Sequence, residues 1–309
     1  MKIKTVFFGT PKYCLPYLEF IYQIEPLALI AAVTQPDKPT GRGLETAPSP
    51  VKQRATSQGV VVLTPTDLGE PDFIQSLKSL KPQLGIMAYY GLKIPQAVID
   101  LFPLGILNIH HSLLPKHRGS NPIPWTILNG ETETGTTIIR IGEKFDTGEI
   151  VGQSRITVSK DETGESLRPR LDESALQLLA KTLPEYLNGK IVAYPQPTAG
   201  GSYDKRITKE DGRIDWRQDA IEIDRKVRAF TPWPGTWTTL EDIVKYCGNK
   251  TFTAVTPQIS ARPGLEENYK QKCKIIRAHL NRDQKLMIDE LQIEGKKPIS
   301  WEDFARGHL

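Results

Sequence analysis

Short apolar runs that alternate with helix-capable segments restrict most strongly how this chain can fold. The runs are rich in β-forming residues and occupy residues 5–8, 29–34, 60–63, 84–89 and 106–109. Segments that can form helices begin at or near proline, which suits a first helical turn, and cover residues 16–24, 49–58, 71–80 and 123–128. Such alternation is typical of a parallel sheet with crossover helices. We therefore predict an α/β fold built on a Rossmann-like parallel sheet.

The pattern changes after Asn129. Residues 136–141 and 149–158 alternate like two strands around a turn that contains Asp146-Thr147-Gly148, which predicts an antiparallel addition to the sheet edge. Leucines then recur at helical spacing over residues 165–187, and Asn188-Gly189 ends this predicted helix. We place the first domain at residues 1–189.

Residues 190–205 lack periodicity and contain prolines and glycines, so we predict a linker there. The second domain is expected at 206–309, with a helix at 220–230 and a terminal helix that starts after Ser300. Short strands are expected at 235–240, 243–247, 250–256, 273–279 and 286–292. Close spacing of short strands indicates a smaller, mostly β domain with an OB-like barrel.

Composition limits the classes of function. The chain has 309 residues, 39% of them hydrophobic and 25% charged, with a formal net charge of +4, so a nucleic-acid partner would have to bind a local basic patch. Cys14, Cys247 and Cys273 show no CxxC spacing, which argues against a zinc site or a disulfide framework. No stretch approaches the ~20 apolar residues of a membrane-spanning helix. We expect a soluble cytoplasmic protein without a metal.

Polar residues that follow a parallel strand suggest where the chemistry lies. Asn108 and His110 are two residues apart, so on a strand both side chains lie on one face, at the edge where open α/β sheets bind ligands. Asp146 follows the next strand and could complete the set. An amide donor, an imidazole and a carboxylate can together stabilise an oxyanion and move a proton.

Spacing alone leaves a structural role open for each of these residues, because turns favour aspartate and buried histidines are commonly structural. Other chemistries have less support. The sequence contains no GxSxG, HExxH, GxGxxG or GxxxxGK[ST] motif, which argues against a serine hydrolase, a zinc protease and a nucleotide-binding loop.

Taken together, the motifs resemble one family. They include Phe8-Gly9-Thr10-Pro11, the segments 35–43, 48–52, 90–92 and 108–115, Arg118-Gly119, Asp146-Thr147-Gly148, and in the second domain 213–216, 228–234 and 294–301. This set is similar to the methionyl-tRNA formyltransferases, which use 10-formyltetrahydrofolate. The Asn-x-His and Asp core is shared with formyltransferases that act on other amines.

The resemblance implies a role for each matched position. Asn108 would donate a hydrogen bond to the formyl oxygen, His110 would stabilise the oxyanion or move the amine proton, and Asp146 would orient the imidazole. Folate contacts are implied for Ser112, Leu113, Leu114, Pro115, Tyr90 and Gly91. A long irregular insertion at residues 34–50 would reach the initiator methionyl-tRNA through Lys38 and Arg42. We expect a monomer that does not bind a membrane.

This sequence also departs from the family. Leu44 and Glu45 stand where many relatives carry basic residues, His111 replaces a small residue, and Lys144 stands where glycine is common. Two rival hypotheses stay open. One is a formyltransferase for an amino sugar nucleotide or another small amine, which has no need for Arg42. The other is a catalytically silent RNA-binding protein on the same scaffold.

Overall fold

The computed structural model describes residues 2–40, 45–142, 144–246 and 271–308. Their contacts form two compact units. The first comprises Met1–Ser120, Thr134–Ile156 and Leu171–Tyr203, and the second Asn121–Glu133, Thr157–Arg170 and Asp204–Leu309. Two short segments before residue 189 thus group with the second unit. The domain boundaries at residues 189 and 206 stay a prediction.

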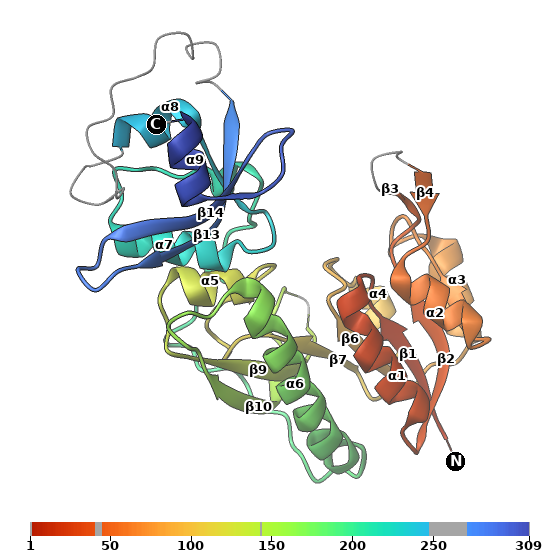
Figure 1. Ribbon diagram of the computed structural model, residues 1–309. Coiled ribbons are helices and arrows are strands. Elements are labelled where there is room, and N and C mark those ends of the chain that lie inside the picture. Colours follow the sequence, from red (N-terminus) through yellow and green to blue (C-terminus); the bar gives the residue numbers. More distant parts are fainter. Residues whose placement is uncertain (1, 41–44, 143, 247–270, 309) are drawn as a thin grey trace. The chain divides into compact units, whose positions relative to one another are not determined.

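A seven-stranded sheet with the order β10-β9-β7-β6-β1-β2-β5 forms the centre of the first unit (Figure 1). The strands β1, β2, β5, β6 and β7 run parallel to their neighbours among these five, which confirms the predicted parallel sheet. The elements that lie wholly or mainly in this unit are β1 (Ile3–Phe8), α1 (Leu15–Gln23), β2 (Leu27–Val33), β3 (Lys38–Thr40), β4 (Glu45–Ala47), α2 (Pro50–Ser57), β5 (Val61–Leu63), α3 (Pro71–Ser79), β6 (Leu84–Ala88), α4 (Gln96–Ile99), β7 (Ile106–His110), β8 (Arg118–Gly119), β9 (Glu133–Arg140), β10 (Glu149–Thr157) and α6 (Gly164–Leu187).

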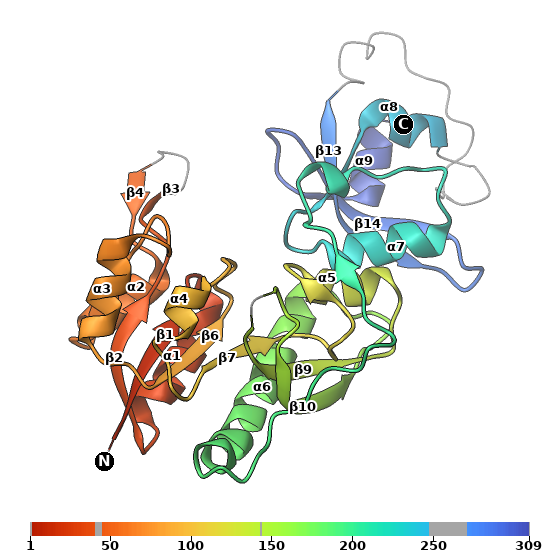
Figure 2. The same ribbon diagram turned by 180° about the vertical axis from the view of Figure 1, so that it is seen from behind.

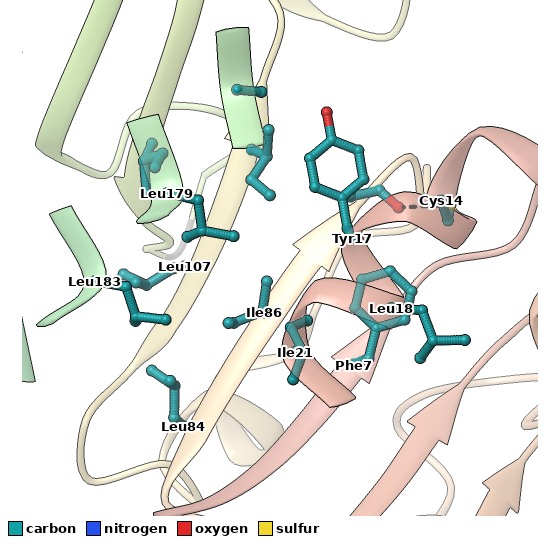
Figure 3. Close-up of a cluster of buried hydrophobic side chains, with 14 of the residues drawn as sticks. Phe7, Cys14, Tyr17, Leu18, Ile21, Leu84, Ile86, Leu107, Leu179 and Leu183 are labelled. Carbon is teal, nitrogen blue, oxygen red and sulfur yellow. Dashed lines mark hydrogen bonds between the residues drawn. The ribbon is translucent and has the colours of Figure 1, made fainter. Parts of the chain in front are cut away.

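Helices cover both faces of this sheet because successive strand residues point to opposite sides. Phe7 packs with buried residues of α1, α2 and α6, whereas Val6 and Phe8 pack with those of α3 and α4. Figure 3 shows side chains of α1 and α6 meeting the strand residues Ile86 and Leu107 on the first of these faces. The sheet is therefore buried on both sides, as its near-continuous apolar runs require.

The sheet edge carries the predicted antiparallel addition. Strand β9 pairs antiparallel with β7, with Asn108 opposite Ile139, and β10 lies beside β9. A Cβ atom on Gly135 would lie 1.9 Å from the carbonyl oxygen of Ser154, so this close approach of the two strands requires glycine. The prediction of an edge addition is confirmed.

The insertion at residues 34–50 is more regular than expected. Strands β3 and β4 pair antiparallel, with Lys38 opposite Ala47 and Pro39 opposite Thr46. The prediction of a long irregular insertion is therefore wrong for its two arms, because a backbone ladder satisfies their polar groups. Residues 41–44 lie outside the described residues.

The second unit contains a four-stranded sheet with the order β12-β13-β14-β15, antiparallel throughout. Figure 2 shows α7 beside the β13 and β14 strands, with which it shares a hydrophobic core. A domain rich in antiparallel strands is thus confirmed, and closure as an OB-like barrel stays a prediction. The elements of this unit are α5 (Pro122–Leu128), α7 (Ala220–Ala229), β12 (Thr236–Thr239), α8 (Leu240–Tyr246), β13 (Lys272–Leu280), β14 (Leu286–Ile293), β15 (Ile299–Ser300) and α9 (Trp301–His308).

One predicted strand of this unit is wrong. Residues 243–247 were expected to be extended, yet helix α8 covers Leu240–Tyr246. The Thr239 hydroxyl accepts a hydrogen bond from the backbone N–H of Asp242 at 3.1 Å, which caps the helix start, and Glu241 and Asp242 lie in its first turn. The cap and the acidic residues beside the helix dipole stabilise the helix more than the β-branched Ile243 and Val244 favour a strand. The predicted strand at 250–256 lies outside the described residues.

Candidate active site

Strand β7 brings two polar side chains to the carboxyl edge of the parallel strands. Asn108 and His110 are both buried, with 8% and 6% of their surface exposed. They share a face with Ile106, which packs with the α3 and α4 side chains. A strand that is apolar elsewhere thus places two hydrogen-bonding groups where ligands of open α/β sheets bind.

Asp146 joins these two residues from the turn between β9 and β10. Its Oδ1 accepts a hydrogen bond from Nδ2 of Asn108 at 3.3 Å and lies 3.7 Å from Nδ1 of His110. Its Oδ2 accepts from the backbone N–H of Gly119 at 2.9 Å. The structure therefore brings the three predicted residues together around one carboxylate.

The contacts of His110 determine which ring nitrogen can exchange a proton. Nε2 lies 2.8 Å from the backbone carbonyl oxygen of His117. A carbonyl only accepts hydrogen bonds, so Nε2 carries a hydrogen. Nδ1, which faces Asp146, is then the nitrogen that can take up a proton, and the carboxylate would stabilise the resulting imidazolium.

The turn that carries Asp146 has an unusual backbone. Asp146 itself has φ +51°, in the left-handed region that aspartate tolerates better than most residues. Two residues on, a Cβ atom on Gly148 would lie 1.9 Å from the carbonyl oxygen of Arg140, so only glycine fits. Lys144 is exposed, and its carbonyl oxygen accepts a hydrogen bond from the Thr147 hydroxyl at 3.2 Å.

Gln196 was missed by sequence reasoning, because it lies between prolines in the segment predicted as a linker. Its Nε2 donates to the carbonyl oxygens of Asp146 at 2.7 Å and Gly148 at 2.9 Å. Its Oε1 accepts from Nη2 of Arg118 at 2.7 Å. Gln196 thus fixes the backbone that presents the Asp146 carboxylate. No periodic or motif signal in the sequence marks this residue.

Thr137 on β9 fixes the loop that consists of Ser112, Leu113, Leu114 and Pro115. The Thr137 hydroxyl donates to the Ser112 carbonyl oxygen at 2.6 Å and accepts from the Leu114 backbone N–H at 3.1 Å. Ser112 is fully buried, and Leu114 packs with Ile139 and Ile150. The side chains of Ser112 and Leu114 therefore face the interior, which leaves the loop backbone, Leu113 and Pro115 as the groups that could contact a ligand.

Tyr90 and Gly91 follow β6 beside this loop. The Tyr90 side chain is buried with Phe8, whose ring centroid lies 5.8 Å away, and burial raises the pKa of the Tyr90 phenol. The Tyr90 carbonyl oxygen accepts from Nε2 of Gln35 at 3.0 Å. Gly91 has φ +74°, and a Cβ atom there would meet no heavy atom of another residue within 4 Å. Only the backbone of these two residues is placed to contact a ligand.

The two residues expected to bind tRNA lie in the β3–β4 segment. Nζ of Lys38 donates to Oε1 of Gln35 at 2.6 Å, so the lysine lies next to the residue that binds Tyr90. Arg42 lies outside the described residues. Within the parts of the chain that the structure describes, no group of histidine, cysteine, aspartate and glutamate residues is arranged to bind a metal ion. No described helix is long and apolar enough to span a membrane.

Family models match almost the whole chain. The Formyl transferase model matches residues 3–183, and the Formyl transferase, C-terminal domain model matches residues 206–309. The chain belongs to the formyltransferase family. One model matches the chain before the predicted linker at residues 190–205, and the other matches the chain after it.

This formyltransferase shares more than a third of its residues with relatives that match it over nearly the whole length. A protein of Myxococcus xanthus named methionyl-tRNA formyltransferase is 36% identical, with 99% of this chain and 95% of that protein covered. A protein of the same name from Methylacidiphilum infernorum is 37% identical, with 99% and 95% covered.

Solved structures share the fold of this formyltransferase at lower identity. An N-formyltransferase of Helicobacter canadensis, in complex with folinic acid and dTDP-3-aminofucose, superposes with a TM-score of 0.62 at 19% identity, covering 96% of this chain and 98% of that one. A 4-N formyltransferase of Francisella tularensis gives a TM-score of 0.61 at 20% identity, covering 83% and 99%.

Proposed function

We propose that this formyltransferase moves a formyl group from 10-formyltetrahydrofolate to the α-amino group of initiator methionyl-tRNA, and that it works in the cytoplasm as a monomer. One observation carries the proposal. Proteins named methionyl-tRNA formyltransferase match 99% of this chain at 36% and 37% identity, through the second domain as well as the first. The N-formyltransferase of Helicobacter canadensis covers a similar share of this chain at only 19% identity, so the higher identity favours methionyl-tRNA as the acceptor.

The donor would bind along the carboxyl ends of β6 and β7. The open space at Gly91 and the backbone that follows Tyr89 suit a flat pterin ring, and the loop at 112–115 is fixed rigidly enough to form one wall. The donor would bring the formyl carbon, and the chain would orient it. Rigid placement of the reacting groups contributes to rate by itself.

Asn108 would act on the formyl oxygen. Its Nδ2 carries two hydrogens, and the bond to Asp146 uses one of them. The other is available to the formyl oxygen as that atom gains negative charge, an effect typically worth about 3 kcal/mol of the barrier. Nδ1 of His110 would take the proton that the attacking amine releases, while Asp146 stabilises the imidazolium that forms. The imidazolium would then give this proton to N10 of the leaving tetrahydrofolate as the bond between the formyl carbon and N10 breaks.

The acceptor would approach the β3–β4 segment. Lys38 lies there, and Arg42 belongs to the same segment of the sequence. Two cations four positions apart in the sequence suit the phosphate backbone of RNA, whose binding depends mainly on such contacts. This assignment explains why a protein with a net charge of only +4 could bind a polyanion locally.

The experiment that tests the proposal is an acid-gel assay of formyl transfer from 10-formyltetrahydrofolate to initiator methionyl-tRNA. Wild-type protein should transfer the group, and Asp146→Ala should not. A parallel assay offers dTDP-linked amino sugars as acceptors. Formyl transfer to the amino sugar and not to the tRNA would show that the acceptor is the sugar. Binding of tRNA without any transfer would favour a silent RNA-binding protein.

Arg42→Ala separates the tRNA contact from the chemistry. We expect a higher KM for methionyl-tRNA and an unchanged affinity for the folate. Lys190→Ala is the matched control, since Lys190 is an exposed cation shortly after α6. The last turn of α6 lies at the amino end of β7, where the Tyr186 hydroxyl donates to the Leu104 carbonyl oxygen. Lys190 therefore lies near the end of β7 that is opposite the proposed donor site. Equal KM values for both variants would contradict a role for Arg42.

A further inference from the structure

A second polar cluster lies on the opposite face of the sheet from Asn108 and His110. It consists of Tyr17 on α1, Tyr89 after β6, His111 after β7 and Asp172 on α6. His111 is 4% exposed, and the Asp172 side chain is 14% exposed. The aliphatic core of α1 and α6 surrounds this position, and Figure 3 shows the Tyr17 hydroxyl pointing away from Leu18, Ile21 and Phe7.

Three groups converge on one oxygen of Asp172. Oδ1 accepts hydrogen bonds from the Tyr17 hydroxyl at 2.7 Å and the Tyr89 hydroxyl at 2.8 Å, and it lies 3.2 Å from Nε2 of His111. Burial is the largest cause that raises the pKa of Tyr17, followed by the neighbouring Tyr89 and Asp172, so this phenol keeps its proton and stays a donor. The carboxylate thus connects α6 to the ends of two central strands.

The end of β6 depends on this connection. Tyr89 has φ +50°, a left-handed conformation that costs an aromatic residue free energy unless its surroundings enforce it. Its ring packs near His111, at a centroid distance of 5.1 Å, and its hydroxyl reaches Asp172. The turn at Tyr89 then directs Tyr90 into the opposite core and exposes the Gly91 backbone.

The end of β7 has the same support. His111 follows His110 directly, and its Nδ1 lies 3.1 Å from the Thr136 hydroxyl on β9. A ring held by Thr136 at Nδ1, with the Asp172 carboxylate 3.2 Å from Nε2, limits the backbone freedom of the residue before it. Asp172 therefore contacts the neighbours of both the donor-binding backbone and the imidazole that faces Asp146.

We propose that Tyr89 and Asp172 are positioning residues for the donor site, acting through the backbone of Tyr90-Gly91 and through His111; this rests on the function proposed above. Both side chains contact each other and His111 in the cluster on the opposite face of the sheet from Asn108. A purely structural cluster would treat Tyr17 and Tyr89 alike, because each gives one phenol hydrogen bond to the same oxygen. A positioning cluster distinguishes them, since only Tyr89 adjoins the donor-binding backbone.

Tyr89→Phe and Tyr17→Phe form a matched pair for this test, since each removes one hydroxyl and one bond to Asp172. Binding of folinic acid to the full-length protein is measured by titration calorimetry, with KM and kcat for the formyl donor measured in parallel. Losing a hydrogen bond to a charged group should raise the Kd and the donor KM about tenfold in Tyr89→Phe. Tyr17→Phe should change both less than twofold. Both variants should lower the melting temperature.

Asp172→Asn removes the charge and keeps the size of the side chain. We expect it to raise the donor KM, as Tyr89→Phe does, and to lower kcat as well, because Nε2 of His111 also loses its charged neighbour. Equal effects of the two tyrosine variants on the Kd would overturn the inference while wild-type binding stands. Wild-type protein that binds no folinic acid would overturn the proposed function and this inference with it.

Discussion

Nδ2 of Asn108 donates to Oδ1 of Asp146 at 3.3 Å, across 38 positions of sequence. The contact joins the carboxyl end of a parallel strand to the turn of the antiparallel edge addition. It orients the amide so that its second hydrogen is free of Asp146, and it places the carboxylate beside Nδ1 of His110, 3.7 Å away. One aspartate thus orients both a hydrogen-bond donor and a proton acceptor.

Asp146→Asn keeps the shape of the side chain and removes its charge. We expect kcat to fall by about a hundredfold or more, because the imidazolium of His110 loses its stabilising partner. Single-turnover transfer from 10-formyltetrahydrofolate measures the effect. The Kd for folinic acid should change little, which shows that the variant is folded. A wild-type rate would refute the role of the carboxylate.

His110→Gln retains a donor for the His117 carbonyl oxygen and cannot accept the amine proton. The rate should fall by about 10²–10⁴-fold, the usual contribution of a positioned acid or base. His279→Gln is the control, because Nδ1 of His279 also contacts an aspartate, Asp289, at 2.9 Å in the second unit. Steady-state kinetics of both variants make the comparison, and equal rates would count against His110 as the proton acceptor.

Gln196→Ala should lower kcat about tenfold, since the backbone at Asp146 and Gly148 loses two hydrogen bonds worth roughly 1 kcal/mol each. Gln53→Ala is the control, because Gln53 lies on the exposed face of helix α2 and its Nε2 donates to a backbone carbonyl oxygen at 3.1 Å. The measurement is kcat of each variant at a saturating concentration of the formyl donor. If Gln196→Ala retains the full rate, the turn does not need this support.

Two buried thiols should resist labelling in the folded protein. Burial raises the pKa of Cys14 well above its ordinary value, and it raises that of Cys273 to about 12. At pH 8 roughly one Cys273 thiol in ten thousand is then ionised, so a thiol reagent reacts slowly. In a Cys247→Ser background, Ellman's reagent should label neither residue within minutes, and both after unfolding in urea. Rapid labelling of the native variant would contradict this burial.

Asp211 should make stability depend on pH at the acid end. Hydrogen bonds from Lys205 and Thr208 lower the pKa of its carboxyl from 3.8 to about 2. A folded-state pKa below the unfolded value stabilises the protein above about pH 4, and this contribution is lost as pH falls through about 2. The free energy of unfolding in urea should therefore differ between wild type and Asp211→Asn at pH 6, and the difference should narrow towards pH 3.

Asp283→Asn, which removes an exposed carboxylate from a turn of the same unit, is the control for the change in net charge. Its difference from wild type should stay smaller than that of Asp211→Asn at pH 6. A difference for Asp211→Asn that is the same at pH 6 and pH 3 would show that its hydrogen bonds do not lower the pKa.

Local patterns were enough to predict most of the first unit. Short apolar runs placed β1, β2, β5, β6 and β7, and prolines near helix starts placed α1, α2 and α3, to within two or three residues, because these signals lie within each element. The wrong strand at 243–247 shows the limit of this approach. There a threonine cap, which favours a helix, overrode a β-branched pair.

Candidate residues near one another in the sequence were predictable for the same reason. Asn108 and His110 lie two residues apart on a strand, so alternation alone put them on one face. Gln196 could not be found in this way, because its partners Asp146 and Gly148 lie about fifty residues away in sequence and no periodicity links them.

The sequence by itself determined the alternation of strands and helices that builds the parallel sheet, and the strand that carries Asn108 and His110. Tertiary structure alone decided that one carboxylate, Asp146, meets both side chains, and that Asp172 gathers two tyrosines and a histidine on the opposite face of the sheet. The physical reason is the distance along the sequence over which each kind of interaction acts. Propensity, capping and alternation act over a few residues, whereas hydrogen bonds between distant segments exist only after the sheet and its helices have packed.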